Sequence, residues 1–246
     1  LYEYLTDEEK DVEAEIKNTD LETTDLNTFL GNTIFDGIIR DRKIRYADTG
    51  NDYNFTRRLD YKLLSKEFEL GIHVITPFND DAGNFDILRS QNMGSSELMI
   101  ILPDDPRLVM DVQMYLRTRK YINLNINTSQ KDSVRKIIDD KRHQNDTRMQ
   151  DIDRRLRDVL GSATILVNGD DIDIKSADPR IRISSAFQDL VMRTYPNLSM
   201  IKGTAYTEGQ LKLFLEPDDS LYKGTPDALT EAEQEVLSAI KRIVLE

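Results

Sequence analysis

The chain has 246 residues and carries 45 acidic against 33 basic side chains, a formal net charge of -12 that weakens any case for a surface built wholly to bind nucleic acid. It has no cysteine and only two histidines, which excludes disulfides, thiolate chemistry and a histidine-rich metal site within one chain. No apolar run approaches the roughly 20 residues that span a bilayer, so the sequence predicts a soluble globular protein without a membrane partner.

The N-terminal region predicts two helices. Thr6 and Glu9 have the spacing of a capping box and predict a helix that ends near Lys17. A second helix is predicted over 25–39, because apolar residues recur there with helical spacing. Since the chain opens with Leu1 in a helix-forming segment, we expect it to be a fragment of a longer polypeptide.

The next segments have β character. Short β runs within 43–59 flank a turn-forming stretch and predict a hairpin with a longer loop. A buried strand is predicted over 68–76, and the continuous apolar run 98–102 is typical of a strand covered on both faces. The intervening segment 79–96 is rich in Asn, Asp, Gly and Ser, and we predict an exposed loop there.

Two helices follow. Asp105 and Pro106 form a start signal for a helix that runs to about Tyr121. Segment 129–160 has the composition of a long helix, but 141–148 is polar at every position. A helix cannot bury an apolar stripe that it lacks, so this middle part either projects into solvent, turns back as a helical hairpin, or meets a charged partner.

Segment 163–175 predicts a β-hairpin, because two β runs flank Asn168 and Gly169, the dipeptide best suited to a type I′ turn. Asp178 and Pro179 repeat the helix start signal. The apolar face of the helix that follows consists of Ile183, Phe187, Leu190 and Val191. Towards the C-terminus we predict a short helix over 211–215, capped by Thr207, and a last helix opened by the capping box of Thr230 and Glu233.

Together these elements predict an α+β fold, in which small antiparallel sheets and hairpins pack with helices and with one long charged helix or helical hairpin. We expect three regions. The first, 1–128, is an α+β subdomain with the N-terminal helices, a hairpin and buried strands. The second, 129–160, is the long charged helix or helical hairpin, and the third, 161–246, is a β-hairpin plus helical subdomain.

No convincing catalytic constellation is present, and we predict no catalytic and no cofactor-binding residue in this chain. A nucleotide-phosphate loop needs clustered glycines and usually a Lys-Ser or Lys-Thr pair at a helix start. The stretches GSSELM from Gly94 and GSATIL from Gly161 lack the lysine and the second glycine. ATP hydrolysis by this chain alone is therefore not expected.

The acidic run Asp170, Asp171 and Asp173 with Lys175 is similar to the carboxylates and lysine of metal-dependent nucleases. In a tight hairpin, however, alternation places Asp171 and Asp173 on one polar face, which favours a solvated strand, and we predict no metal ligand. His73 lies in an apolar run with no evident partner and is interpreted as a core or sheet-face residue.

The most plausible binding surface is basic and centres on the long helix. Its nucleic-acid or partner-contact candidates are Arg135, Lys136, Lys141, Arg142, Arg148, Arg154, Arg155 and Arg157. On one face these side chains could follow a phosphate backbone. Interleaved aspartates, however, are typical of charges that pair along an exposed helix, which favours self-paired charges or a protein partner over nucleic acid.

Several stretches scattered over the chain resemble one protein family. They are LYEYLTDEEKDVEAEIKN at the start, FELGIHVITPF from Phe68, ILVNGDDIDIKSADPRIRI from Ile165, YPNLSMI from Tyr195 and LTEAEQEVLSAI from Leu229. With these, the chain resembles the region that follows the N-terminal ATPase part in the BrxC/PglY family, the large P-loop ATPases of the BREX bacteriophage-exclusion system.

This resemblance implies a cytoplasmic phage-defence ATPase that acts with other BREX components, including a methyltransferase and an alkaline-phosphatase-like protein. ATP and Mg²⁺ are expected only for the full-length protein, because the family's Walker motif has no counterpart in this chain. Our leading hypothesis is a non-catalytic internal scaffold, oligomerisation or partner-docking module. The alternatives are a DNA-binding module that uses the basic helix and a metal-dependent nuclease that uses the acidic hairpin.

Overall fold

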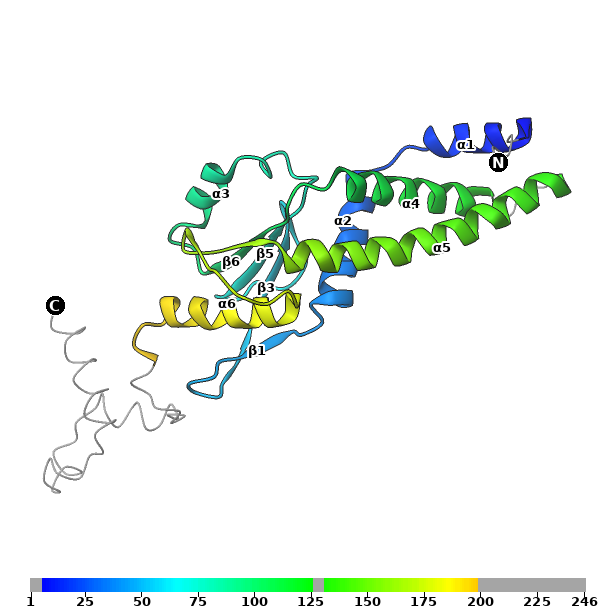
Figure 1. The fold of residues 1–246 in the computed structure, drawn as a ribbon. Coiled ribbons are helices and arrows are strands. Elements are labelled where there is room, and N and C mark those ends of the chain that lie inside the picture. The colour runs from blue at the N-terminus through cyan, green and yellow to red at the C-terminus, as the bar shows by residue number, and fades with distance from the viewer. Residues whose placement is uncertain (1–5, 126–130, 199–246) are drawn as a thin grey trace, which may run out of the picture.

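A β-sheet with helices on both faces forms one end of the molecule, and long helices run away from it at the other end (Figure 1). The structure is a computed structural model that describes residues 6–125 and 131–198. The predicted α+β class is confirmed. The helices predicted after Thr207 and Thr230 lie outside the described residues. In the part of the chain that is described, no helix is both long enough and apolar enough to cross a membrane.

The main sheet has six strands in the order β4-β3-β5-β6-β7-β8. Their bounds are β3 Thr56–Leu59, β4 Lys62–Leu63, β5 Gly71–Ile75, β6 Glu97–Ile101, β7 Thr164–Val167 and β8 Asp170–Asp171. The central strands β3, β5 and β6 are parallel, whereas the outer pairs are antiparallel. The sheet is therefore larger than predicted and mixed. Because β6 pairs with β7, segments on both sides of the long helix enter one sheet.

Alternation along the central strands separates two apolar faces. Ile72 and Val74 of β5 point into the main core, which is covered by helices of the N-terminal region, the end of the long helix and α6 (Pro179–Thr194). On the other face, Ile75 and Met99 belong to a smaller cluster under a single short helix. The described residues cover that second face only in part, and polar groups lie beside the cluster.

The N-terminal elements follow the predictions closely. Helix α1 (Asp7–Lys17) opens with the capping box of Thr6 and Glu9. The second predicted helix consists of α2 (Thr23–Gly31) and the π-helical segment η1 (Asn32–Ile38), where the Ile39 N–H donates to the Ile34 carbonyl. The predicted hairpin is formed by β1 (Lys43–Arg45) and β2 (Asp52–Asn54), which pair in a separate antiparallel sheet.

The predicted loop 79–96 was wrong over part of its length, because it contains helix α3 (Phe85–Asn92). The Asn84 side chain caps this helix by accepting a hydrogen bond from the Ile87 N–H. The polar composition concealed two residues that point inwards, Leu88 and Asn92, both buried. Two buried positions on one face are enough to hold a short helix on the sheet, although its average composition is that of a loop.

Both helix start signals built on Asp-Pro are confirmed. Asp105 accepts hydrogen bonds from the N–H groups of Arg107 and Leu108 and opens α4 (Pro106–Asn125). Asp178 caps α6 in the same way. The type I′ hairpin between β7 and β8 is also confirmed, since Asn168 and Gly169 both have positive φ, 52° and 79°.

The long charged segment forms one continuous helix, α5 (Asp132–Gly161), and not a helical hairpin. It packs along α4, and its polar middle meets α1 and α4 of the same chain. Asn145, buried in this middle part, donates a hydrogen bond to the Tyr115 carbonyl at 3.1 Å. The polar stretch therefore packs through specific side-chain contacts where an apolar stripe is missing.

Candidate functional site

Helix α5 joins two separate hydrophobic clusters. Its C-terminal half contributes Ile152, Leu156, Val159 and Leu160 to the main core beneath the sheet. Its N-terminal half enters a second cluster, which consists of Val12, Ile16, Tyr121, Ile122, Ile137 and Ile138. A helix of 30 residues is about 45 Å long. We call α1, α4 and the N-terminal half of α5 the helical arm.

Four of the eight predicted contact residues on α5 form ion pairs with acids on the same helix, three or four positions away. The pairs are Arg135–Asp132, Arg142–Asp139, Arg154–Asp151 and Arg157–Asp153. Lys136 is exposed and forms no ion pair with any described residue. Exposed pairs of this kind contribute little to stability. They do, however, balance the charge along the helix, so these arginines do not form an uncompensated basic face.

Arg155 has a different role from its neighbours. Its Nη1 atom lies 3.1 Å from Asp105 Oδ2, and both side chains are largely buried. Burial raises the pKa of Asp105, but hydrogen bonds from the Leu108 N–H and the Arg155 guanidinium outweigh it and hold the pKa below its usual value. Arg155 therefore fastens α5 to the start of α4 and is not available to an outside partner.

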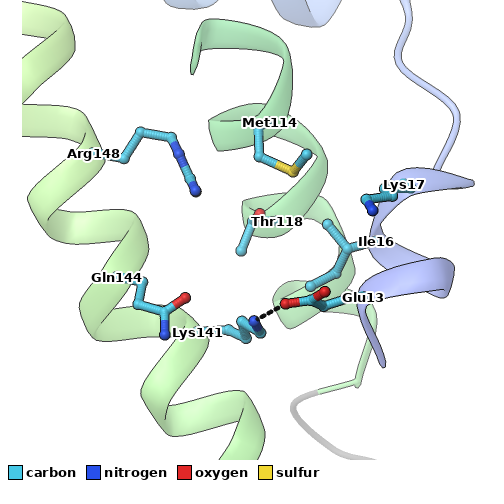
Figure 2. Close-up of a pocket in the computed structure, with 8 residues that line it drawn as sticks. All are labelled: Glu13, Ile16, Lys17, Met114, Thr118, Lys141, Gln144 and Arg148. Atoms are coloured by element: carbon cyan, nitrogen blue, oxygen red, sulfur yellow. Dashed lines mark hydrogen bonds and ion pairs between the residues drawn. The ribbon is translucent and has the colours of Figure 1, made fainter. Parts of the chain in front are cut away.

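Two further predicted residues, Lys141 and Arg148, line a pocket between α1, α4 and α5, shown in Figure 2. We call it the arm pocket. Its volume is about 160 Å³, and its lining is Glu13, Ile16, Lys17, Met114, Thr118, Lys141, Gln144 and Arg148. Lys141 Nζ lies 2.7 Å from Glu13 Oε1, and Arg148 donates to Asn145 Oδ1 at 3.1 Å. Lys17, which the sequence interpretation did not include, comes from α1.

A second polar region lies on the partly covered face of the sheet. Arg58 Nε is 3.2 Å from Glu97 Oε1, and His73 Nδ1 is 3.6 Å from Glu97 Oε2. His73 Nε2 lies 2.6 Å from the carbonyl of Asp60, so this nitrogen carries the proton and donates it. The predicted sheet-face position of His73 is confirmed, but its Nε2 atom has a hydrogen-bond partner that the sequence did not reveal, and the Glu97 carboxylate lies near its Nδ1 atom.

Asp60, at the end of β3, completes this region. It has φ 50°, is buried, and its carboxylate accepts hydrogen bonds from the N–H and hydroxyl of Thr76, both at 2.8 Å. Burial raises its pKa. Nearby, the Tyr61 hydroxyl donates to Asp81 at 2.7 Å. Asp60, Tyr61, His73 and Asp81 line a cleft of about 260 Å³. His73 bonds to no hydroxyl among the described residues, so it is not a base poised on a nucleophile in this cleft.

His73 makes the stability of the protein depend on pH. Burial lowers its pKa below the ordinary value of 6.5 in the folded state. The unfolded chain therefore binds a proton at higher pH than the folded chain does, and the free energy of unfolding should decline as the pH falls below about 6.5. Urea unfolding at about pH 7.5 and about pH 5.5 measures the decline. His73→Gln should reduce it, and His143→Gln, at an exposed histidine, should leave it unchanged. An equal decline in wild type and His73→Gln would contradict this assignment.

The acidic hairpin does not assemble a metal site in the structure. Asp170 pairs with Arg193, while Asp171, Asp173 and Lys175 are exposed. Over residues 6–125 and 131–198, no group of three or more His, Cys, Asp or Glu side chains is arranged to hold a metal ion. The nuclease hypothesis therefore has no coordination geometry to support it within these ranges.

Comparison with known families agrees with the observed sheet. Residues 19–190 match a family model described as the BREX ATP-binding protein BrxC 4th domain with six-stranded beta sheet. The matched span contains all six strands of the main sheet, together with α2 to α5 and most of α6, whereas α1 precedes it. No solved structure matches the chain.

Proposed function

The chain belongs to the family of the fourth domain of BrxC, a BREX ATP-binding protein, and we propose that it acts as a non-catalytic internal scaffold or partner-docking module of a phage-defence ATPase. One observation carries this proposal. Helix α5 runs without interruption from the main core to the second cluster in the helical arm. A single helix that is packed at both ends couples the position of the helical arm to that of the main core. Such coupling is what a scaffold between neighbouring domains requires.

The chemistry of the ATPase belongs, in this proposal, to other parts of the full-length protein. In keeping with the resemblance to the family, ATP and Mg²⁺ are assigned to those parts, and this chain itself has no Walker motif. The protein works in the cytoplasm with other BREX components, among them a methyltransferase and an alkaline-phosphatase-like protein. The helical arm is the surface that we assign to such partners or to a second copy of the chain.

The DNA-binding alternative has weaker support. Four of the eight basic candidates pair with acids of their own helix, and Arg155 pairs with Asp105. A phosphate backbone would have to compete with these intramolecular pairs for each arginine. No observation on the described residues favours the nuclease alternative.

Disruption of the helical arm should abolish docking while the sheet stays folded. Ile137 and Ile138 are buried in the second cluster. Replacing both with Asp buries unpaired carboxylates, which costs several kcal/mol, and should detach α1 from the arm. In cells with the complete BREX operon, the variant should lose phage restriction and should no longer co-purify the methyltransferase and the alkaline-phosphatase-like component.

The matched control is Lys136→Asp, one position earlier on the same helix, where the side chain is exposed and unpaired among the described residues. It should restrict phage and co-purify these components as the wild type does. Full restriction by the Ile137→Asp, Ile138→Asp variant, with the arm shown by amide exchange to be open, would refute the proposed role of the arm.

A further inference from the structure

We propose that the arm pocket binds a small oxyanion of the phosphate class. This inference stands apart from the scaffold role, since it concerns a ligand and not a protein partner. The pocket lies where α1 meets α4 and α5, and Figure 2 shows Arg148 reaching from α5 towards Thr118 on α4, with Lys17 on the opposite wall. Three kinds of observation carry it: local charge, an unpaired hydroxyl, and size.

The pocket is positively charged in an otherwise acidic chain. Lys17, Lys141 and Arg148 face a single carboxylate, that of Glu13, in a protein whose formal net charge is -12. Glu13 is engaged by Lys141 at 2.7 Å, and no ion pair between Lys17 and another described residue is found. Among the described residues, the Arg148 guanidinium donates a hydrogen bond to the Asn145 side-chain oxygen and forms no ion pair. Most of the N–H donors of Lys17 and Arg148 are therefore left for an anion.

A hydroxyl without a hydrogen-bond partner among the described residues also belongs to the lining of this pocket. Thr118 lines it and is only 3% exposed, yet no hydrogen bond of its hydroxyl is found to any described residue. A threonine within a helix ordinarily bonds back to the carbonyl four positions earlier. The Thr118 hydroxyl is not one of the fully buried polar atoms, so it is an accessible donor in the pocket, and a ligand oxygen beside Arg148 would accept its hydrogen bond.

The size of the pocket limits the ligand. Sites for drug-sized molecules occupy roughly 300–1,000 Å³, whereas the arm pocket has about 160 Å³. It accommodates a phosphate group but not a whole nucleotide, and a duplex cannot enter it. The bound species is therefore free phosphate or the terminal phosphate of a larger molecule. The anion lies on the side of Lys17, Thr118 and Arg148, away from the carboxylate of Glu13.

The test is calorimetric titration of the whole chain with inorganic phosphate at constant ionic strength. We expect saturable binding at one site. Arg148→Gln removes a charge-assisted hydrogen bond and should weaken binding by about tenfold or more. Thr118→Val keeps the shape of the side chain but removes the unpaired hydroxyl. It should weaken binding while leaving the thermal midpoint unchanged or higher, which a merely structural role for this hydroxyl would not produce.

Arg154→Gln is the matched control, because Arg154 pairs with Asp151 outside the pocket. It should bind phosphate as the wild type does. If a nucleoside diphosphate competes with inorganic phosphate, the pocket also accepts the terminal phosphate of a larger molecule. No saturable binding, or equal binding in Arg148→Gln, overturns the proposal. Retention of duplex DNA that phosphate does not displace and that Arg148→Gln abolishes also overturns it, in favour of nucleic acid.

Discussion

Replacement of Phe187 by Ala is expected to lower the free energy of unfolding by about 3–5 kcal/mol. Phe187 is fully buried on α6, and its ring meets that of Phe55 edge to face, with 5.9 Å between the centroids. Because α6 packs on β6 and β7, the cavity would open between the helix and the centre of the sheet. Urea unfolding at equilibrium, followed by far-UV circular dichroism, measures the loss.

The control for this prediction is Met192→Ala on the same helix. Met192 is 52% exposed, so its truncation should change the free energy of unfolding by about 0.5 kcal/mol or less. A loss below about 1 kcal/mol for Phe187→Ala would mean that the core beneath α6 is not packed as described.

Replacement of Asn92 by Ala should lower the free energy of unfolding by about 2–4 kcal/mol. Asn92 is completely buried at the end of α3. Its amide donates to the Glu97 carbonyl, and its side-chain oxygen accepts from the Gly169 N–H, both at 2.8 Å. Removing this side chain leaves a partly buried carbonyl and a buried N–H without these partners, and it removes the hydrogen bond between α3 and the Gly169 N–H of the β7–β8 turn.

Amide hydrogen exchange provides a second measurement of this change. The Gly169 N–H should exchange faster in Asn92→Ala than the lower global stability of the variant alone would explain, because its hydrogen-bond acceptor is gone. Gln91→Ala, at the preceding exposed position of the same helix, should leave both quantities nearly unchanged. Unaltered protection of Gly169 in Asn92→Ala would show that the hydrogen bond between α3 and the turn is not formed in solution.

Helix starts were predictable because each depends on one side chain and the next few backbone groups. Thr6, Asp105 and Asp178 all accept hydrogen bonds from the first turns of their helices, as expected from spacing alone. The same holds for Asn168 and Gly169, whose positive φ angles follow from local sterics. Helix α3 was missed because polar residues surround it in the sequence and only Leu88 and Asn92 are buried in it, with Phe85 packed at the edge of the cluster that contains Leu88.

The pairing of strands could not be inferred from the chain. An apolar run such as 98–102 indicates burial on both faces, but it does not say which strands lie beside it or in which direction they run. The polar region of the sheet depended on this pairing, since Arg58 and His73 occupy registered positions on neighbouring parallel strands. The sequence interpretation therefore had no means of giving His73 its partners.

The candidate pocket shows the same division between local and long-range information. Lys141 and Arg148 were selected from the composition of one helix, but Lys17 and Thr118 join them only because α1 and α4 pack there. Conversely, the sequence grouped Arg154 and Arg157 with these residues, but in the structure both form ion pairs with aspartates of their own helix.

By itself, the sequence determined the caps, the turns, the helical composition of the segment that forms α5 and the resemblance to the BrxC family, but it left open whether that segment is one helix or a helical hairpin. These depend on residue types within a few positions of one another or on recognisable stretches of sequence. Only the tertiary structure decided that the central strands are parallel, that α5 joins two hydrophobic clusters, and that cations from α1 and α5 share one pocket. Contacts between segments far apart along the chain are selected by mutual packing and burial over the whole domain, and a local pattern does not contain that information.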